Sequence, residues 1–177
     1  MTYIERVRTP MLDREAWDLV DRTLGEHTDD YVSPNQVRMI MSLLGIEHGA
    51  KDDTRAPALG RACWNLWCWN WGNRRGGEGD RGAYYMVAPE IIDGRRKEVG
   101  GGWPAFSAAE TGLVAWYRKM AEDYGAAWRY LLALQVNRGS TAAFAKELKS
   151  GLYMTAAEGE YADGLATWYR IFERRGW

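Results

Sequence analysis

The sequence predicts an α+β fold that is predominantly α-helical and carries a small glycine-rich β flap near its middle. In both halves of the chain, apolar residues recur at three- and four-residue spacing, which is the pattern of amphipathic helices. Between residues 72 and 102, glycines interrupt that pattern repeatedly, so no long helix is expected there. The length of 177 residues is close to the size of one domain, and residues 1–177 are expected to form a single domain.

Two helices are predicted before the flap. The first covers Asp13–Leu24, and Gly25 is expected to end it. The second begins after Ser33, whose hydroxyl can cap the helix while Gln36 returns a hydrogen bond to the cap residue. This helix is expected to run to Gly49, because glycine commonly terminates helices.

Four more helices are predicted after the flap, over residues 107–124, 126–136, 140–151 and 155–172. The first opens with Ser107 and the last with Thr155, and each is followed three residues later by a glutamate. That spacing is the capping-box pattern of helix N-termini.

Inside the flap, two apolar stretches are expected to form short strands, Tyr84–Val87 and Ile91–Ile92. The residues Asp93–Gly94 follow them and predict a hairpin turn. Pro89 cannot donate a ladder hydrogen bond, so the sheet is expected to be small.

The composition excludes several classes of function. The net charge of −1 provides no field that would attract nucleic acid or an anionic membrane. No apolar run is long enough to cross a membrane, and the first residues lack a signal-peptide pattern. We therefore expect a soluble protein made in the cytoplasm, with no membrane insertion. Cys63 and Cys68 are too few for a disulfide framework and are expected to be reduced thiols.

No metal and no cofactor are expected. His27 and His48 lie far apart in the sequence and lack the spacing of zinc ligands, so both are expected to be structural or solvent-facing. Residues 76–79 are glycine-rich, but they lack the lysine and the following helix of a phosphate-binding loop.

The aromatic residues are the unusual part of the composition. Ten Trp and ten Tyr against three Phe favour rings that carry a polar N–H or O–H group. Such rings suit a groove for sugars, whose C–H faces stack on indoles while their hydroxyls bind nearby polar groups. The alternative is a core that is simply rich in tryptophan.

Glu47 departs from the helical pattern around it. It lies three residues after Leu44 and seven after Ile40, so an otherwise apolar helix face ends in a carboxyl group. Desolvation favours the neutral form of a carboxyl group, which is the form that a general acid needs. The alternative is a solvated or salt-bridged glutamate at a helix end.

Tryptophans and asparagines alternate between Cys63 and Asn73, and they cannot all be buried on one face of a helix or a strand. Asparagine can bind sugar hydroxyl and acetamido groups, and tryptophan supplies a stacking plane. The alternative is a floor of the core in which the asparagines satisfy the backbone of a turn. The candidate substrate-binding residues are Trp67, Trp69, Asn70, Trp71 and Asn73.

Glu47-His48-Gly49, the run Trp67–Asn73, and the segment Tyr153–Ala162 with its Tyr-x-Thr-x-x-x-x-x-Tyr spacing occur in a recognisable order. Together with residues 103–112 and 142–148, they resemble the glucosaminidase branch of the lysozyme-like peptidoglycan hydrolases, over roughly residues 35–172. This chain departs from that family at His48, where the family has a small hydroxyl residue, and in an insertion-like segment, Lys51–Arg61.

The resemblance implies a lysozyme-like fold and hydrolysis of the β-1,4 glycan of peptidoglycan, as an endo-β-N-acetylglucosaminidase or a muramidase. It implies that Glu47 is the general acid, that Asn70 and Asn73 line sugar subsites, and that Tyr153 faces the cleft beside the scissile bond. A second carboxylate is usual in glycosidases, and the flap offers Glu78 and Asp80. The substrate's own 2-acetamido group is the alternative for that second role.

The expected partner is the peptidoglycan glycan strand, bound by a monomer. A missing signal peptide suits a phage-type lysin that is released by another protein or delivered as part of a larger machine. Two other functions stay open: a non-catalytic domain that binds glycan, such as a phage structural component, and a lytic transglycosylase. Arg74 and Arg75 are candidates to meet acidic stem peptides, with solvated loop charges as the alternative.

Overall fold

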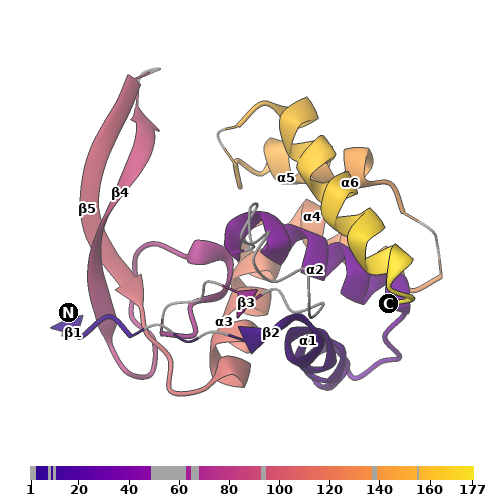
Figure 1. Ribbon diagram of the computed structural model, residues 1–177, viewed down its shortest axis with the longest axis horizontal. Coiled ribbons are helices and arrows are strands. Elements are labelled where there is room, and N and C mark those ends of the chain that lie inside the picture. Colours follow the sequence, from indigo (N-terminus) through magenta and orange to yellow (C-terminus); the bar gives the residue numbers. More distant parts are fainter. Residues whose placement is uncertain are drawn as a thin grey trace.

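The computed structural model describes residues 3–7, 9, 11–48, 63–64, 68–92, 95–136, 139–154 and 156–177. Within these residues the helices are α1 (Asp13–Thr28), α2 (Pro34–His48), α3 (Ala109–Asp123), α4 (Gly125–Ala133), α5 (Thr141–Ser150) and α6 (Glu158–Arg174) (Figure 1). The strands are β1 (Tyr3–Ile4), β2 (Met11–Leu12), β3 (Cys63–Trp64), β4 (Ala83–Ile92) and β5 (Arg95–Pro104), and a short 3-10 turn, η2, covers Trp71–Asn73. The predicted α+β class, mostly helical with a small sheet, is confirmed.

The core is built around α2, which contacts α1, α4, α6 and η2. Its side chains are buried on all sides, including Met39, Met41 and Leu43 beside the predicted apolar stripe. The helix axes of α2 and α6 approach closely at Gly45, where a Cβ atom would lie 2.5 Å from the ring of Trp168. A helix that is buried on most sides belongs in the interior. In the last turn of α2, His48 stays buried and Glu47 is half-buried.

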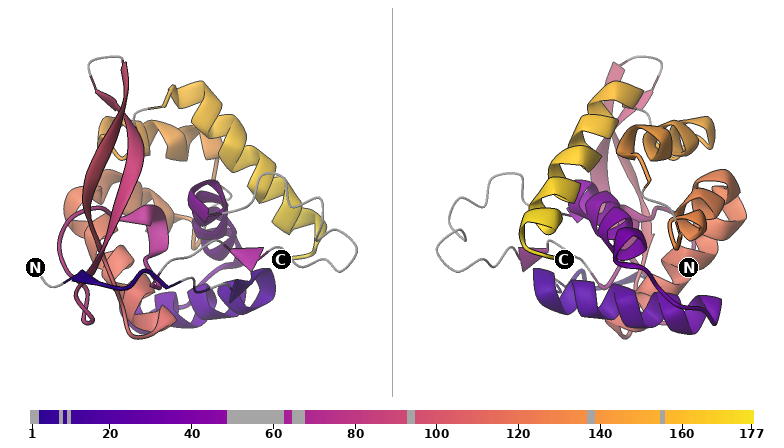
Figure 2. Two further views of the ribbon diagram at one scale, coloured as in Figure 1. Left: turned by 60° about the vertical axis from the view of Figure 1, so that its left-hand side comes forward. Right: turned by 90° about the vertical axis from the view of Figure 1, so that its right-hand side faces the viewer.

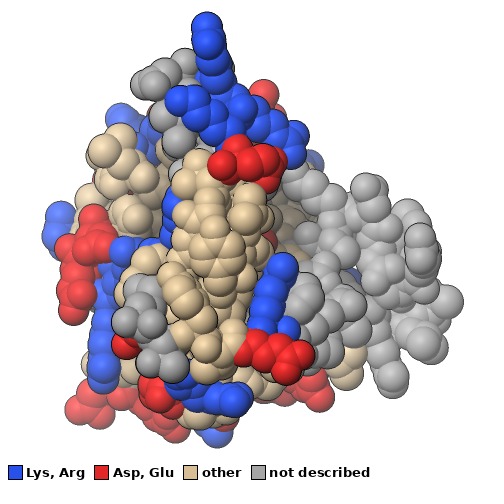
Figure 3. Space-filling model, turned by 90° about the vertical axis from the view of Figure 1, so that its left-hand side faces the viewer, with Lys and Arg blue, Asp and Glu red and all other residues tan. Residues whose placement is uncertain are grey.

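The β4–β5 hairpin stands away from the helices and forms one side of the molecule (Figures 1 and 2). The strands pair antiparallel from Ala83–Pro104 to Ile92–Arg95, and β1 adds to the other edge of β4 in parallel. The outer face of the hairpin is largely uncharged, and Lys and Arg side chains gather at its end (Figure 3). The exposed residues at that end include Arg95, Arg96 and Lys97.

A hairpin is confirmed, but Tyr84–Val87 and Ile91–Ile92, predicted as two strands, both belong to β4, which pairs with β5. The predicted turn residues Asp93 and Gly94 lie outside the described residues. Pro89 is part of β4 and pairs with Glu98. In the described part of the chain β1 covers only the first two residues of β4, so Pro89 lies where β4 is an edge strand, which is where sheets tolerate proline. Gly100 of β5 has to be small, because the Tyr85 hydroxyl of β4 occupies the space that a side chain at position 100 would take.

Three predicted helix boundaries are wrong. The helix α1 passes through Gly25 and ends at Thr28, since one glycine costs a helix only about 1 kcal/mol. Ser107 does not cap α3, because its hydroxyl and its N–H both bind the carboxylate of Asp80. The helix predicted over residues 126–136 is α4, which begins at Gly125 and ends at Ala133.

The capping box before α2 is confirmed. The Gln36 N–H donates to Ser33 Oγ at 3.3 Å, and the Ser33 N–H donates to Gln36 Oε1 at 2.8 Å. Ser140 caps α5 by accepting from the Ala143 N–H. The predicted roles of Gly49 and Thr155 fall on residues outside the described part of the chain. No helix in the described residues is both long and apolar enough to cross a membrane.

Candidate active site

Glu47, the second-to-last residue of α2, is half-buried and lines a cavity of about 300 Å³. The other lining residues come from η2 and the turn after it, from α3 and the residue that follows it, and from the segment between α5 and α6. They are Gly72, Arg74, Arg75, Trp116, Lys119, Met120, Tyr124 and Tyr153. Among these described residues Glu47 carries the only carboxyl group, so the cavity wall combines one acid with three cations.

Tyr161, on α6, holds the carboxyl group of Glu47. Its hydroxyl donates a hydrogen bond of 2.9 Å to Glu47 Oε1. Burial, followed by the charge of Glu47, raises the pKa of Tyr161 above its ordinary range. The phenol therefore stays protonated and acts as a fixed donor that orients the acid.

Tyr153 and Trp116 bring two further polar groups to the cavity. The Tyr153 hydroxyl and the Trp116 Nε1 are both buried, and within the described structure neither has a hydrogen-bond partner. Burial and then the charge of Glu47 raise the pKa of Tyr153 well above its ordinary range. The Trp116 indole N–H faces this hydroxyl and opposes part of the rise, but its geometry falls short of a hydrogen bond. Both groups are potential donors to a ligand.

The turn at η2 forms the cavity wall next to Glu47. Gly72 has φ +68°, and a Cβ atom there would lie 2.4 Å from Trp116 Nε1, so only glycine fits this position. The Gly72 N–H donates to Nε2 of the buried His48 at 2.8 Å. Since Nε2 accepts this bond, the imidazole is neutral with its proton on Nδ1.

Asn70 and Trp71 were candidates for sugar binding, and the structure places both side chains in the interior. Asn70 is 1% exposed; its Nδ2 donates to the Arg74 carbonyl at 2.8 Å, and its Oδ1 accepts from the Arg74 N–H at 3.2 Å. Trp71 is fully buried, and its indole N–H donates to the Ala109 carbonyl. Asn70 therefore satisfies the backbone of the turn and Trp71 packs in the core, which agrees with the alternative interpretation of this run.

The remaining members of the tryptophan–asparagine run are less engaged with the cavity. Trp69 is half-buried and packs against the main core, and it does not line the cavity that holds Glu47. Trp67 lies outside the described residues, and so does the side chain of Asn73.

The structure separates the flap acids from Glu47. Glu78 and Asp80 line a different cavity, which shares no lining residue with the one that holds Glu47. The hydroxyl of Ser107 hydrogen-bonds to Asp80 and is the main reason that the pKa of Asp80 lies below its ordinary value. Asp80 thus joins the flap to the start of α3.

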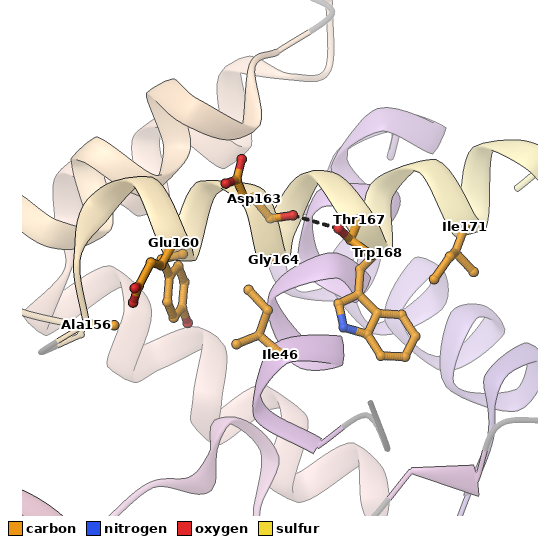
Figure 4. Close-up of a pocket in the computed structure, with 9 residues that line it drawn as sticks. Ile46, Ala156, Glu160, Asp163, Gly164, Thr167, Trp168 and Ile171 are labelled. Carbon is orange, nitrogen blue, oxygen red and sulfur yellow. Dashed lines mark hydrogen bonds between the residues drawn. The ribbon is translucent and has the colours of Figure 1, made fainter. Parts of the chain in front are cut away.

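A larger cavity, of about 650 Å³, lies along α6 beside the end of α2 (Figure 4). Ile46, Trp168 and Ile171 give it a largely apolar lining, and its acids, Glu160 and Asp163, are exposed on the helix surface. Tyr161 lines this cavity as well, so it separates the apolar groove from Glu47. We place the candidate active site in the smaller cavity because it holds the partly buried acid.

Sequence reasoning missed the contributions of Tyr161 and Trp116 to this site, whereas Arg74 had been a candidate for binding acidic stem peptides. Tyr161 belongs to the Tyr-rich segment that carries the family resemblance, and its distance from Tyr153 was the available signal. Trp116 was correctly assigned to the buried face of α3, but helical spacing does not show where an indole N–H points. No group of three or more His, Cys, Asp or Glu side chains in the described residues is arranged to hold a metal ion.

The arrangement of helices around α2, with a hairpin at one side, is a lysozyme-like α+β fold. It is similar to the crystal structure of a peptidoglycan hydrolase mutant from Sphingomonas sp. A1, with a TM-score of 0.51 and 18% identity, over 89% of this chain and 97% of that chain.

A C-terminally truncated glycoside hydrolase domain from Salmonella typhimurium FlgJ aligns at 13% identity over 90% of this chain and 98% of that chain, with a TM-score of 0.45. No protein-family model and no curated protein matches the sequence. At 18% identity the likeness to the Sphingomonas structure shows a shared fold, and function has to be argued from the site.

Proposed function

We propose that the protein hydrolyses the glycan strands of peptidoglycan, with Glu47 as the general acid. The observation that carries the proposal is a half-buried carboxyl group, oriented by Tyr161, in the wall of a cavity. The fold shared with a protein described as a peptidoglycan hydrolase supports this substrate class. Within it, cleavage after N-acetylglucosamine is the bond specificity that the family resemblance favours.

In this mechanism, protonated Glu47 donates its proton to the glycosidic oxygen as the bond from C1 to that oxygen breaks. Glu47 is then a carboxylate and accepts a proton from the water that adds at C1. The Tyr161 hydrogen bond keeps the carboxyl group in one orientation through both steps. The Tyr153 hydroxyl, neutral and without a partner in the described residues, donates to the substrate beside the scissile bond.

We assign the second catalytic role to the 2-acetamido group of the substrate. Its carbonyl oxygen attacks C1 as the leaving group departs and forms an oxazolinium ring; water then opens the ring, which restores the acetamido group and leaves a hydroxyl at C1. Two observations support this assignment over the flap acids: Glu78 and Asp80 line a separate cavity, and Asp80 is hydrogen-bonded to Ser107.

The test compares Glu47→Gln with wild-type protein on purified cell walls, with reducing ends as the readout. Glutamine is nearly isosteric but cannot give up a proton, so the rate should fall at least about a hundredfold. Glu26→Gln, at an exposed position on α1, is the matched control and should keep the wild-type rate. Equal rates for Glu47→Gln and wild type would overturn the assignment.

Mass spectrometry of the same digests separates the proposed reaction from its two rivals. A hydrolase leaves reducing ends, and a lytic transglycosylase leaves anhydro-sugar ends. Binding to cell walls without release of either product would identify a non-catalytic glycan-binding domain.

A further inference from the structure

Arg74 is the least satisfied charged residue in the cavity that holds Glu47. Its side chain is half-buried, and its Nε and Nη1 atoms are buried without a hydrogen-bond partner in the described structure. Its guanidinium group lies over the ring of Phe106, 5.9 Å from the ring centre. Burial lowers the pKa of Arg74, and the charges of Asp123 and Glu122 oppose that effect. No carboxylate of the described residues forms an ion pair with it.

The other two cations of the cavity are engaged by the protein. Arg75 donates to the Gly100 carbonyl at 2.9 Å and lies over the ring of Trp103. Lys119 forms an ion pair with Asp123, one helical turn along α3. Of these three cations, Arg74 is the one whose buried N–H groups have no hydrogen-bond acceptor among the residues that the structure describes.

The backbone of Arg74 is held in place although its side chain lacks partners. The Asn70 amide binds both the N–H and the carbonyl of Arg74, so this residue cannot move without breaking two partly buried hydrogen bonds. A fixed backbone, a guanidinium group in a cavity wall and unpaired N–H donors are what a preorganised anion site needs. The planar fork of arginine matches a carboxylate in particular, because two parallel hydrogen bonds can form.

We propose that Arg74 binds a carboxylate of the substrate, and this inference rests on the proposed function. In peptidoglycan that carboxylate belongs to the stem peptide or, where the peptide has been removed, to the lactyl group of N-acetylmuramic acid. Arg74 is therefore a specificity residue: it selects an acidic glycan strand over a neutral polymer of N-acetylglucosamine.

The test measures binding in the Glu47→Gln background, so that cleavage does not interfere. Co-sedimentation is measured with intact peptidoglycan, with glycan strands stripped of peptide by an amidase, and with peptidoglycan whose carboxylates have been methyl-esterified. The added variants are Arg74→Gln, Arg74→Lys and, as a charge-matched control, Arg129→Gln at an exposed position on α4 that does not line the cavity. Thermal melting of each variant checks that it is folded.

Arg74→Gln should weaken binding to intact peptidoglycan roughly ten- to a hundredfold, as expected for the loss of charge-assisted hydrogen bonds. The affinity of Arg74→Lys should lie between those of the parent and Arg74→Gln, because lysine keeps the charge but lacks the planar fork of arginine. Arg129→Gln should bind like its parent. On esterified peptidoglycan the loss caused by Arg74→Gln should disappear. A loss that persists on stripped strands identifies the lactyl carboxylate, and a loss confined to intact material identifies the stem peptide.

The inference is overturned if Arg74→Gln binds intact peptidoglycan as its parent does, or if its loss is equal on the esterified form. If Arg74→Gln does not fold, the same comparison of intact and esterified peptidoglycan is made with Arg74→Lys. Failure of the proposed function gives a different result: wild-type protein would bind peptidoglycan in an Arg74-dependent way but release no reducing ends. Absence of binding to every form overturns the inference about Arg74, and release of reducing ends by the wild-type protein still decides the proposed function.

Discussion

The hydroxyl of Tyr161 donates a hydrogen bond to Oε1 of Glu47 across 114 positions of sequence. This contact joins the end of α2 to the first turns of α6, two helices that also pack against each other at Gly45 and Trp168. The packing of the two helices therefore decides where the carboxyl group points.

Tyr161→Phe should lower kcat on cell walls about tenfold, because the acid loses the donor that orients it. The ring stays, so stability and binding to peptidoglycan should change little. Initial rates of reducing-end release and urea unfolding of the same preparation check this. An unchanged kcat would show that the hydrogen bond does not position Glu47.

Asp80→Asn should keep cell-wall activity, since Asp80 binds Ser107 and lines a cavity apart from Glu47. The carboxylate is mostly exposed, so the stability loss at neutral pH should stay below about 1 kcal/mol. The Ser107 hydrogen bond depresses the folded-state pKa of Asp80, so its contribution is present above the unfolded value of about 3.9 and is lost as pH falls through the folded pKa. Urea unfolding curves of variant and wild type should therefore converge in acid. A loss of activity comparable to that of Glu47→Gln would restore Asp80 to the catalytic site.

Gly72→Ala should destabilise the fold by about 2–4 kcal/mol, because the methyl group would collide with the Trp116 indole and the backbone is left-handed there. Gly76→Ala is the matched control: Gly76 also has a positive φ, but open space surrounds it. The difference in urea midpoint between Gly72→Ala and Gly76→Ala measures the cost of the collision with Trp116. Equal losses would mean that the turn can shift away from Trp116 at no cost.

His27→Gln should reduce the dependence of stability on pH in mild acid. Burial, and next the charge of Arg118, lowers the folded-state pKa of His27. Below the unfolded value of about 6.5, the unfolded chain takes up a proton that the folded protein resists, so stability falls as pH drops from there to the folded pKa. Urea unfolding at about pH 7.5 and about pH 5.5 should show a smaller difference for the variant. The same difference in both proteins would contradict the assignment.

Helix positions could be predicted from the sequence because caps and apolar spacing are local signals. The Ser33–Gln36 pair marks the start of α2 correctly, since both partners lie within one turn. The Ser107 signal fails for a tertiary reason: Asp80, 27 residues away, takes the hydroxyl that the cap would use. The pattern around Gly25 fails because helix packing outweighs the weak preference of one glycine.

The candidate site was predictable only in part. An apolar face that ends in an acid identifies Glu47, since helical spacing alone defines the face. The direction of an amide or indole group is a property of tertiary packing, so the sequence does not show that Asn70 holds the Arg74 backbone. Residue type suggests the chemistry of a side chain, but its neighbours in the fold decide whether its polar atoms are already hydrogen-bonded within the protein.

The two consecutive arginines after η2 connect the wall of the cavity that holds Glu47 to the β4–β5 hairpin. Arg74 is anchored by Asn70 on the helical side, and Arg75 is anchored to Gly100 and Trp103 in the hairpin. A single peptide bond thus joins a residue held beside the candidate active site to a residue held by the projecting hairpin.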